Sequence, residues 1–139
     1  MNGIILGFDP GRDKCGVAVM NADRSVVYHQ VIESDRALAT MQELCQQFSV
    51  ELIVMGDRTT AKSWHQQLKS NLGVSLPIVM VDENNSTLEA RDRYWEIYPP
   101  RGFNRLIPLR MRLPPRPVDD IVAIVLIERY LIKRMKDEG

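Results

Sequence analysis

The sequence lacks the features that would assign it to several common protein classes. Its 18 basic and 18 acidic residues cancel, so the overall charge does not indicate a polyanionic partner. No apolar run approaches the ~20 residues that a membrane span needs. The first residues, Met1-Asn2-Gly3, lead into an apolar stretch without the basic residues of a signal peptide. We therefore expect a cytoplasmic protein that does not contact a membrane.

Cysteine and histidine are also scarce. Cys15 and Cys45 lie in apolar surroundings without metal-type spacing, which favours reduced, buried thiols over a disulfide. His29 and His65 are far apart and have no partner pattern, so we expect both to be surface or half-buried residues. The chain also has no Walker A motif and no Ser-His-Asp arrangement.

What the sequence does contain is a regular alternation of strand-type and helix-type segments. The 139 residues suffice for one domain spanning residues 1–139. Three short apolar runs joined by tight turns predict an antiparallel meander, at residues 3–8, 15–20 and 25–32. Two later runs, 51–55 and 77–81, alternate with helices, and such units imply parallel pairing. The fold class is therefore α/β, with a mixed five-stranded sheet flanked by helices.

Four helices are predicted from apolar spacing and from capping residues. The first begins near Ser34 or Asp35, either of which is a suitable N-cap. The third begins with a capping box formed by Ser86 and Glu89. The last begins at Val118, and its first turns are apolar all round, which predicts burial on all sides. That long apolar helix leaves a homodimer open.

Residues 99–117 are rich in proline and predict a loop or a partly disordered arm within the domain. Their charged residues are all arginine: Arg101, Arg105, Arg110, Arg112 and Arg116. Arginine makes planar contacts to phosphate, so a basic segment on a neutral protein can still bind a polyanion. Tyr94, Trp95 and Tyr98 precede this arm and could stack on bases, although core or interface positions are the simpler interpretation.

Acidic residues lie at the ends of predicted elements rather than on their faces. Asp9 ends the first strand, Asp82-Glu83 follows the fifth, and Asp119-Asp120 begins the last helix. Each has a structural alternative as a turn, loop or N-cap residue. Parallel strands would nevertheless bring these ends to one edge of the sheet. Converging carboxylates repel one another unless a cation neutralises them, and oxygen ligands suit a hard divalent ion such as Mg²⁺.

Three stretches together resemble the YqgF (RuvX) family of Holliday-junction-resolvase-like nucleases. Residues 6–11 (LGFDPG) and 16–19 (GVAV) resemble its opening. Residues 81–90 (VDENNSTLEA) resemble its "DE-R-x-T-T-x-E-A" block, and residues 118–127 (VDDIVAIVLI) resemble its final "V-D-S-x-A-A-x-x-I-L" helix. The similarity covers nearly the whole chain in order and implies a ribonuclease H-like fold.

The resemblance implies metal-dependent phosphodiester hydrolysis on structured nucleic acid, either ribosomal RNA precursor or branched DNA. Its catalytic and metal-binding acids carry over onto Asp9, Glu83 and Asp119, with Asp82 and Asp120 as neighbours that could replace one of them. The implied cofactor is Mg²⁺ or Mn²⁺. Backbone-binding candidates are all basic: Lys14, Arg58, Arg101, Arg105, Arg110 and Arg112.

The chain departs from the family pattern in two loops. Arg12-Asp13-Lys14 follows the first strand's Pro-Gly turn, and Asp57-Arg58 stands where the family has "G-L-P". These departures favour an alternative, a catalytically weak nucleic-acid-binding protein on the same fold. A third hypothesis is a nucleotide phosphate-binding module, because Asp9, Gly11 and Gly16 also resemble the phosphate loop of actin-like ATPases.

Overall fold

Five strands form one mixed sheet in the order β3-β2-β1-β4-β5 in the computed structural model, which describes residues 3–58 and 60–138. The strands are β1 (Ile4–Asp9), β2 (Lys14–Met20), β3 (Val26–Glu33), β4 (Val50–Gly56) and β5 (Ile78–Val81). Side chains 103, 104, 110 and 138 lie outside this description. The predicted mixed five-stranded sheet is confirmed.

The pairing follows from the lengths of the connections. Short turns join β1 to β2 and β2 to β3, and both pairs are antiparallel. Helical crossovers separate β1, β4 and β5, and these strands are parallel, with Phe8 opposite Met55 and Gly56 opposite Val81. The carboxyl ends of all three parallel strands therefore lie at one edge of the sheet.

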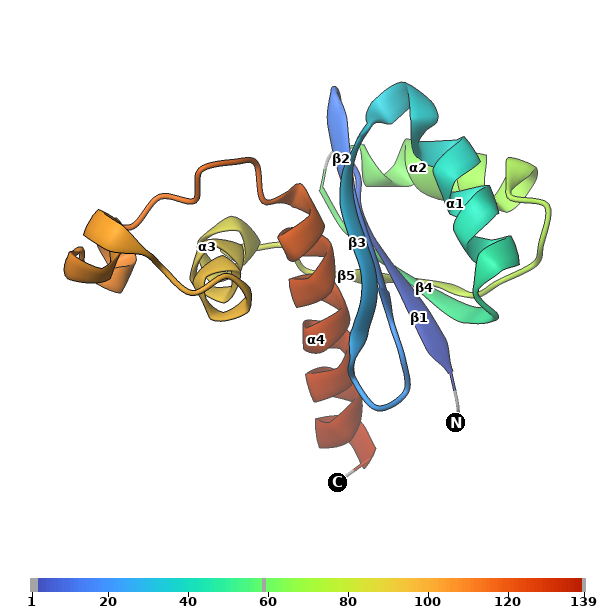
Figure 1. Ribbon diagram of the computed structural model, residues 1–139. Helices are drawn as coiled ribbons and strands as arrows, with labels where there is room; N and C mark the ends of the chain where they lie inside the picture. The colour runs from blue at the N-terminus through green and yellow to red at the C-terminus, as the bar shows by residue number, and fades with distance from the viewer. Residues whose placement is uncertain (1–2, 59, 139) are drawn as a thin grey trace.

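Helices cover both faces of the sheet (Figure 1). One face packs against α1 (Ala37–Gln47) and α2 (Ala61–Asn71), and the other against α3 (Ser86–Ile97) and α4 (Asp119–Glu138). Alternation along β1 divides its side chains between the two cores: Ile5 joins the α4 side, whereas Leu6 and Phe8 join the α1 and α2 side.

The first turns of α4 are buried all round, as predicted. Every residue from Ile121 to Ile127 is buried, because α4 lies between the sheet and α3. Each buried Ile, Leu or Val side chain contributes about 1.5–3 kcal/mol through the area removed from water, so α4 is a major stabilising element. No helix in the described part of the chain is long and apolar enough to cross a membrane.

Two predicted helix starts are wrong. Ser34 begins a short 3₁₀ turn, η1 (Ser34–Arg36), and its hydroxyl donates to the carbonyl of Gly11 at 3.0 Å instead of capping α1. The predicted capping box is absent because Asn85, with φ of 60°, takes the N-cap position of α3. Ser86 is then the first helical residue, is buried, and its hydroxyl has no hydrogen-bond partner among the described residues.

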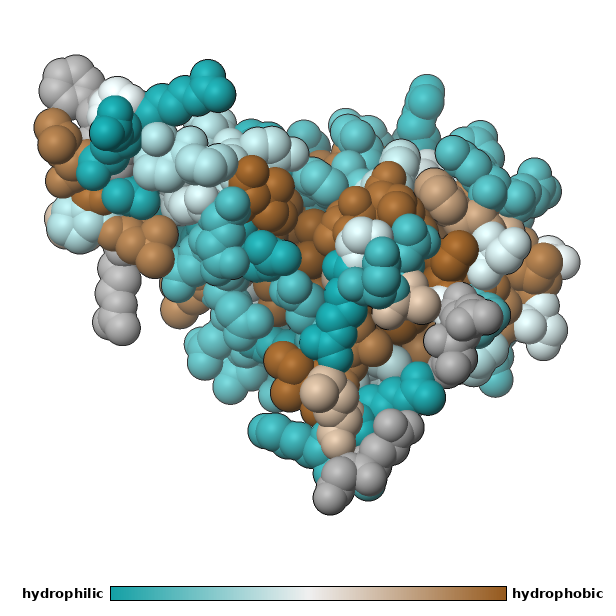
Figure 2. Space-filling view, turned by 60° about the horizontal axis from the view of Figure 1, so that its bottom comes forward, coloured by the Kyte–Doolittle hydropathy of each residue, from teal (hydrophilic) through white to brown (hydrophobic). Residues whose placement is uncertain are grey.

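Residues 99–117 form an extended arm that carries two 3₁₀ turns, η2 (Gly102–Leu106) and η3 (Leu109–Met111). In Figure 1 the arm lies beyond α3, at the far left. It exposes four large apolar side chains, Leu106, Leu109, Met111 and Leu113, and Figure 2 shows apolar surface on this arm. The arm ends at Pro117, two residues before the first residue of α4, Asp119, so the arm and the candidate site are close along the chain.

Candidate active site

The structure brings the three predicted carboxylates to one edge of the sheet. Asp9 is the last residue of β1, Glu83 is the second residue after β5, and Asp119 is the first residue of α4. The side chains of Asp9 and Glu83 share a hydrogen bond, and Asp119 is near enough to act on Asp9 through its charge. The topology therefore groups three acids whose extremes, Asp9 and Asp119, are 110 positions apart in the sequence.

Two glycines allow this convergence. A Cβ at Gly56, the last residue of β4, would overlap the carboxyl group of Glu83. A Cβ at Gly16, on β2, would overlap the backbone carbonyl of Asp119. At Gly16 the atoms in the way belong to the α4 backbone, whereas at Gly56 they belong to the Glu83 side chain. Gly16 is therefore needed for the close approach of α4, and Gly56 leaves room for the Glu83 carboxyl group in its observed position.

Burial and like charge act together on Asp9. The pKa of Asp9 is raised to about 9, chiefly by removal from water and then by the hydrogen bond and charge of Glu83 and the charge of Asp119, while the charge of Arg58 opposes the rise. Burial and crowding therefore favour the protonated form of Asp9 at neutral pH. A carboxyl pair of this kind is a frequent property of functional sites.

Asp119 experiences the same effects more weakly. Burial, followed by the neighbouring charge of Asp120, raises the pKa of Asp119, and the positive charge of Lys14 lowers it. Lys14 begins β2 and is exposed, so it brings a mobile positive charge to the same end of the sheet. The position of Lys14 agrees with a role beside the acids, although its predicted contact with nucleic acid stays a prediction.

The unusual Asp57-Arg58 pair contacts Glu83 from the loop after β4. The Asp57 carboxylate accepts the backbone N–H of Glu83 at 3.2 Å. The Arg58 Nε atom lies 3.4 Å from Glu83 Oε2, which is ion-pair range, and Oε2 has no hydrogen-bond partner among the described residues. Arg58, predicted to hold a nucleic-acid backbone, thus lies against a candidate metal ligand.

The chemistry of the three acids fits a hard divalent cation. Asp9 is destabilised as an anion, and a buried oxygen of Glu83 has no hydrogen-bond partner among the described residues, so added positive charge would relieve both. In the described part of the chain no three acidic, histidine or cysteine side chains are already spaced to surround an ion. Ion binding would therefore require small side-chain movements, with Arg58 turning away from Glu83.

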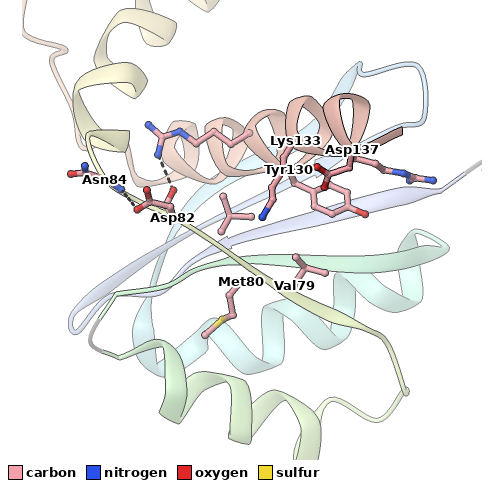
Figure 3. Close-up of a pocket in the computed structure, with 10 residues that line it drawn as sticks. Val79, Met80, Asp82, Asn84, Tyr130, Lys133 and Asp137 are labelled. Carbon is pink, nitrogen blue, oxygen red and sulfur yellow. Dashed lines mark hydrogen bonds between the residues drawn. The ribbon is translucent and has the colours of Figure 1, made fainter. Parts of the chain in front are cut away.

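The neighbouring acid Asp82 points elsewhere. Its carboxylate accepts the backbone N–H of Asn84 at 2.9 Å and lines a cavity of about 760 Å³ between β5 and the later turns of α4 (Figure 3). Arg129 crosses to the same loop and donates to the Asp82 carbonyl at 2.8 Å. The geometry therefore favours Glu83 over Asp82 as the partner of Asp9.

Asp120 forms a second cluster that the sequence did not predict. Its buried carboxylate accepts two hydrogen bonds from Arg116, at 2.9 and 3.2 Å, and lies 2.6 Å from Nδ1 of His29. The Nε2 atom of His29 is 3.4 Å from the hydroxyl of Tyr98. His29 is half-buried, as expected, but it has a partner that no sequence pattern indicated. Its only sequence signal was its place on the same face of β3 as Val27 and Val31.

The arginines of the arm are only partly available to a ligand. Arg101 and Arg105 are exposed. Arg112 donates to the Ile107 carbonyl at 2.7 Å, which holds the arm in shape. The side chain of Arg110 lies outside the described residues. The arm therefore presents at least two exposed guanidinium groups near α3.

Comparison with known proteins agrees with this arrangement. The model of the RuvX family, described as Holliday junction resolvase, matches residues 3–133. The chain belongs to the RuvX family. A relative from Legionella pneumophila, named as a candidate pre-16S rRNA nuclease, is 30% identical over 93% of this chain and 95% of its own length. A relative from Xanthomonas oryzae with the same name is 27% identical over 94% and 88%.

Solved structures support the fold. RuvC of Thermus thermophilus, solved in complex with a Holliday junction substrate, matches this RuvX chain with a TM-score of 0.57 and covers 96% of each chain at 16% identity. A second structure of the same protein gives 0.55. The fold is therefore ribonuclease H-like, as the resemblance implied, and the family assignment places the chain among nucleases that act on nucleic acid.

Proposed function

We propose that this RuvX chain is a divalent-metal-dependent endonuclease that hydrolyses phosphodiester bonds in structured nucleic acid. The observation that carries the proposal is the carboxylate centre of Asp9, Glu83 and Asp119, in which crowding and burial raise the pKa of Asp9 to about 9. The names of the sequence relatives support precursor ribosomal RNA as the substrate. The RuvC complex supports Holliday-junction-type DNA.

In this proposal Asp9, Glu83 and Asp119 hold Mg²⁺ or Mn²⁺. The bound ion supplies positive charge to the phosphate and lowers the pKa of water. The chain itself positions the three carboxylates through the ends of β1, β5 and α4, and it keeps them partly buried so that their charges act strongly. The exposed Lys14, Arg101 and Arg105 hold the nucleic-acid backbone from either side.

The test is cleavage of a four-way DNA junction and of precursor 16S rRNA, each with Mg²⁺ or with EDTA. We expect cleavage only with the metal, and its loss in Asp9→Asn. Asp92→Asn is the matched control, because Asp92 is an exposed acid on α3. Equal cleavage by Asp9→Asn, cleavage in EDTA, or no cleavage of either substrate would contradict the proposal.

A second candidate is a nucleic-acid-binding protein with little catalysis on the same fold. The observation that favours it is Arg58, whose guanidinium lies against Glu83 where a divalent ion would need access. Filter binding in EDTA distinguishes the two functions. Tight binding that weakens steeply as salt rises, without turnover when Mg²⁺ is added, would support this candidate.

A further inference from the structure

The cluster around Asp120 opens into a pocket beside the candidate active site. The pocket has a volume of about 320 Å³. Its polar lining comes from four separate parts of the chain, which are β2, β3, the end of α3 and the junction of the arm with α4: Lys14, His29, Gln30, Tyr98, Arg116 and Asp120. Four parts of the fold thus place polar groups around one open space.

Asp120 holds the inner wall of this pocket in place. Its side chain is 3% exposed, and it binds Arg116 through both oxygens and His29 through Nδ1. Nδ1 lies 2.6 Å from the Asp120 carboxylate and therefore carries the proton of this hydrogen bond. The other ring nitrogen, Nε2, faces the Tyr98 hydroxyl. The imidazole orientation is therefore fixed before any ligand arrives.

The charges of the pocket favour an anion. Lys14 and Arg116 contribute two positive charges, and Asp120 is the one acid among the residues that line the pocket. The Tyr98 hydroxyl, 3.4 Å from Nε2 of His29, can donate to an anion when it turns from that long contact. Arg116 also lies 5.4 Å from the ring centre of Tyr94 and 5.8 Å from that of Tyr98, so its guanidinium is held by stacking as well as by the ion pair.

The pocket adjoins the carboxylate centre. Asp119 and Asp120 are consecutive in the first turn of α4, and successive side chains on a helix point in different directions. Lys14 belongs to both places, because it lines the pocket and its charge acts on Asp119. A strand whose phosphate lay at Asp9 and Asp119 would thus have a neighbouring phosphate within reach of Lys14.

We propose that this pocket is a phosphodiester-binding subsite that holds a phosphate of the bound strand beside the one at the carboxylate centre. Lys14, Arg116 and the Tyr98 hydroxyl contact the phosphate, and Asp120 positions Arg116 and His29 around it. The inference rests on the proposed function, since it assigns a second contact to the same strand. His29 is a contact and a reporter in this proposal, and no step of the chemistry is assigned to it.

The test uses the fact that the chain has two histidines. The probe is a single-stranded hexathymidylate, added to the full chain in EDTA, with imidazole resonances followed by NMR. We expect a saturable shift of the His29 resonances and no shift of those of His65, which lies on α2. Inorganic phosphate should shift His29 only at much higher concentration.

Two variants examine the contacts. Lys14→Gln and Tyr98→Phe should each weaken hexathymidylate binding by roughly tenfold, because each removes a donor to a charged group. Their matched controls are Lys62→Gln on α2 and Tyr130→Phe, which lines the separate cavity of Figure 3. Unchanged thermal unfolding of Tyr98→Phe would exclude a folding defect as the cause.

The outcomes separate this inference from the proposed function. Hexathymidylate binding without a shift of His29, or with full affinity in both variants, overturns the subsite and leaves the nuclease proposal standing. A shift of His29 with phosphate but not with hexathymidylate also overturns it. A His29 shift and weakened variants support the subsite even if no substrate is cleaved, because the measurement is made in EDTA.

Discussion

Replacing Asp9 with asparagine should remove most of the pH dependence of stability that the carboxylate centre causes. An acid whose pKa is higher in the folded protein than in the unfolded chain stabilises the fold most at low pH. That stability is lost as the pH rises from the ordinary pKa of 3.8 toward the folded pKa of about 9. Each pH unit in this window costs about 1.4 kcal/mol, so at pH 7 the loss reaches ~4 kcal/mol at most.

The measurement is urea unfolding in EDTA between pH 4 and pH 8, followed by the fluorescence of Trp64 and Trp95. Wild type should lose free energy of unfolding across this range, whereas Asp9→Asn should lose much less, because the amide cannot ionise. The Asp92→Asn control should follow wild type, since Asp92 lies on the surface of α3.

Parallel pH profiles for wild type and Asp9→Asn would refute the reasoning. They would mean that Asp9 ionises at its ordinary pKa in the folded protein and that Glu83 and Asp119 do not crowd it. A wild-type profile that rises toward pH 8 in EDTA would have the same consequence, because it has the opposite sign.

Three further predictions concern the same centre. Mg²⁺ at ten times its Kd should raise the unfolding free energy of wild type by about 1.4 kcal/mol at pH 8 and leave Asp9→Asn nearly unchanged, as measured by urea unfolding. Arg58→Gln should extend the pH-dependent loss in EDTA to higher pH, because Arg58 lowers the pKa of Asp9, and it should increase the stabilisation by Mg²⁺ in the same assay; a loss that ends at lower pH than in wild type would contradict this. Gly56→Ala should displace Glu83, so that junction cleavage falls strongly while the melting temperature changes little. Full cleavage by this variant would show that Glu83 can move without loss of activity.

The sequence predicted the sheet and the meeting of the acids because both depend on local signals. Apolar runs that end at Asp9 and Glu83 indicate strand ends, and connection lengths distinguish hairpins from crossovers. Once β1 and β5 are both parallel to β4, their carboxyl ends must share an edge. The position of Asp119 then follows from the apolar pattern of α4.

The details that the sequence missed depend on contacts between distant residues. The Ser86 capping box failed because Asn85, in a left-handed conformation, takes the N-cap position one residue before the predicted one, which leaves Ser86 as the first and buried residue of α3. The pairing of His29 with Asp120 joins residues 91 positions apart, and no spacing rule relates them. Strand alternation groups His29 with Val27 and Val31 on one face but does not identify its partner.

The loop after β4 shows how such a long-range contact changes the chemistry of a predictable site. Asp57 fixes the backbone of Glu83, and Arg58 places a positive charge beside the Glu83 carboxylate. Both residues belong to the stretch that departs from the family pattern. Because the same charge opposes the rise in the pKa of Asp9, the chain partly neutralises its own carboxylates. In the proposed function, cation binding at this centre would therefore compete with Arg58, and the affinity for Mg²⁺ would depend on how readily that side chain moves away.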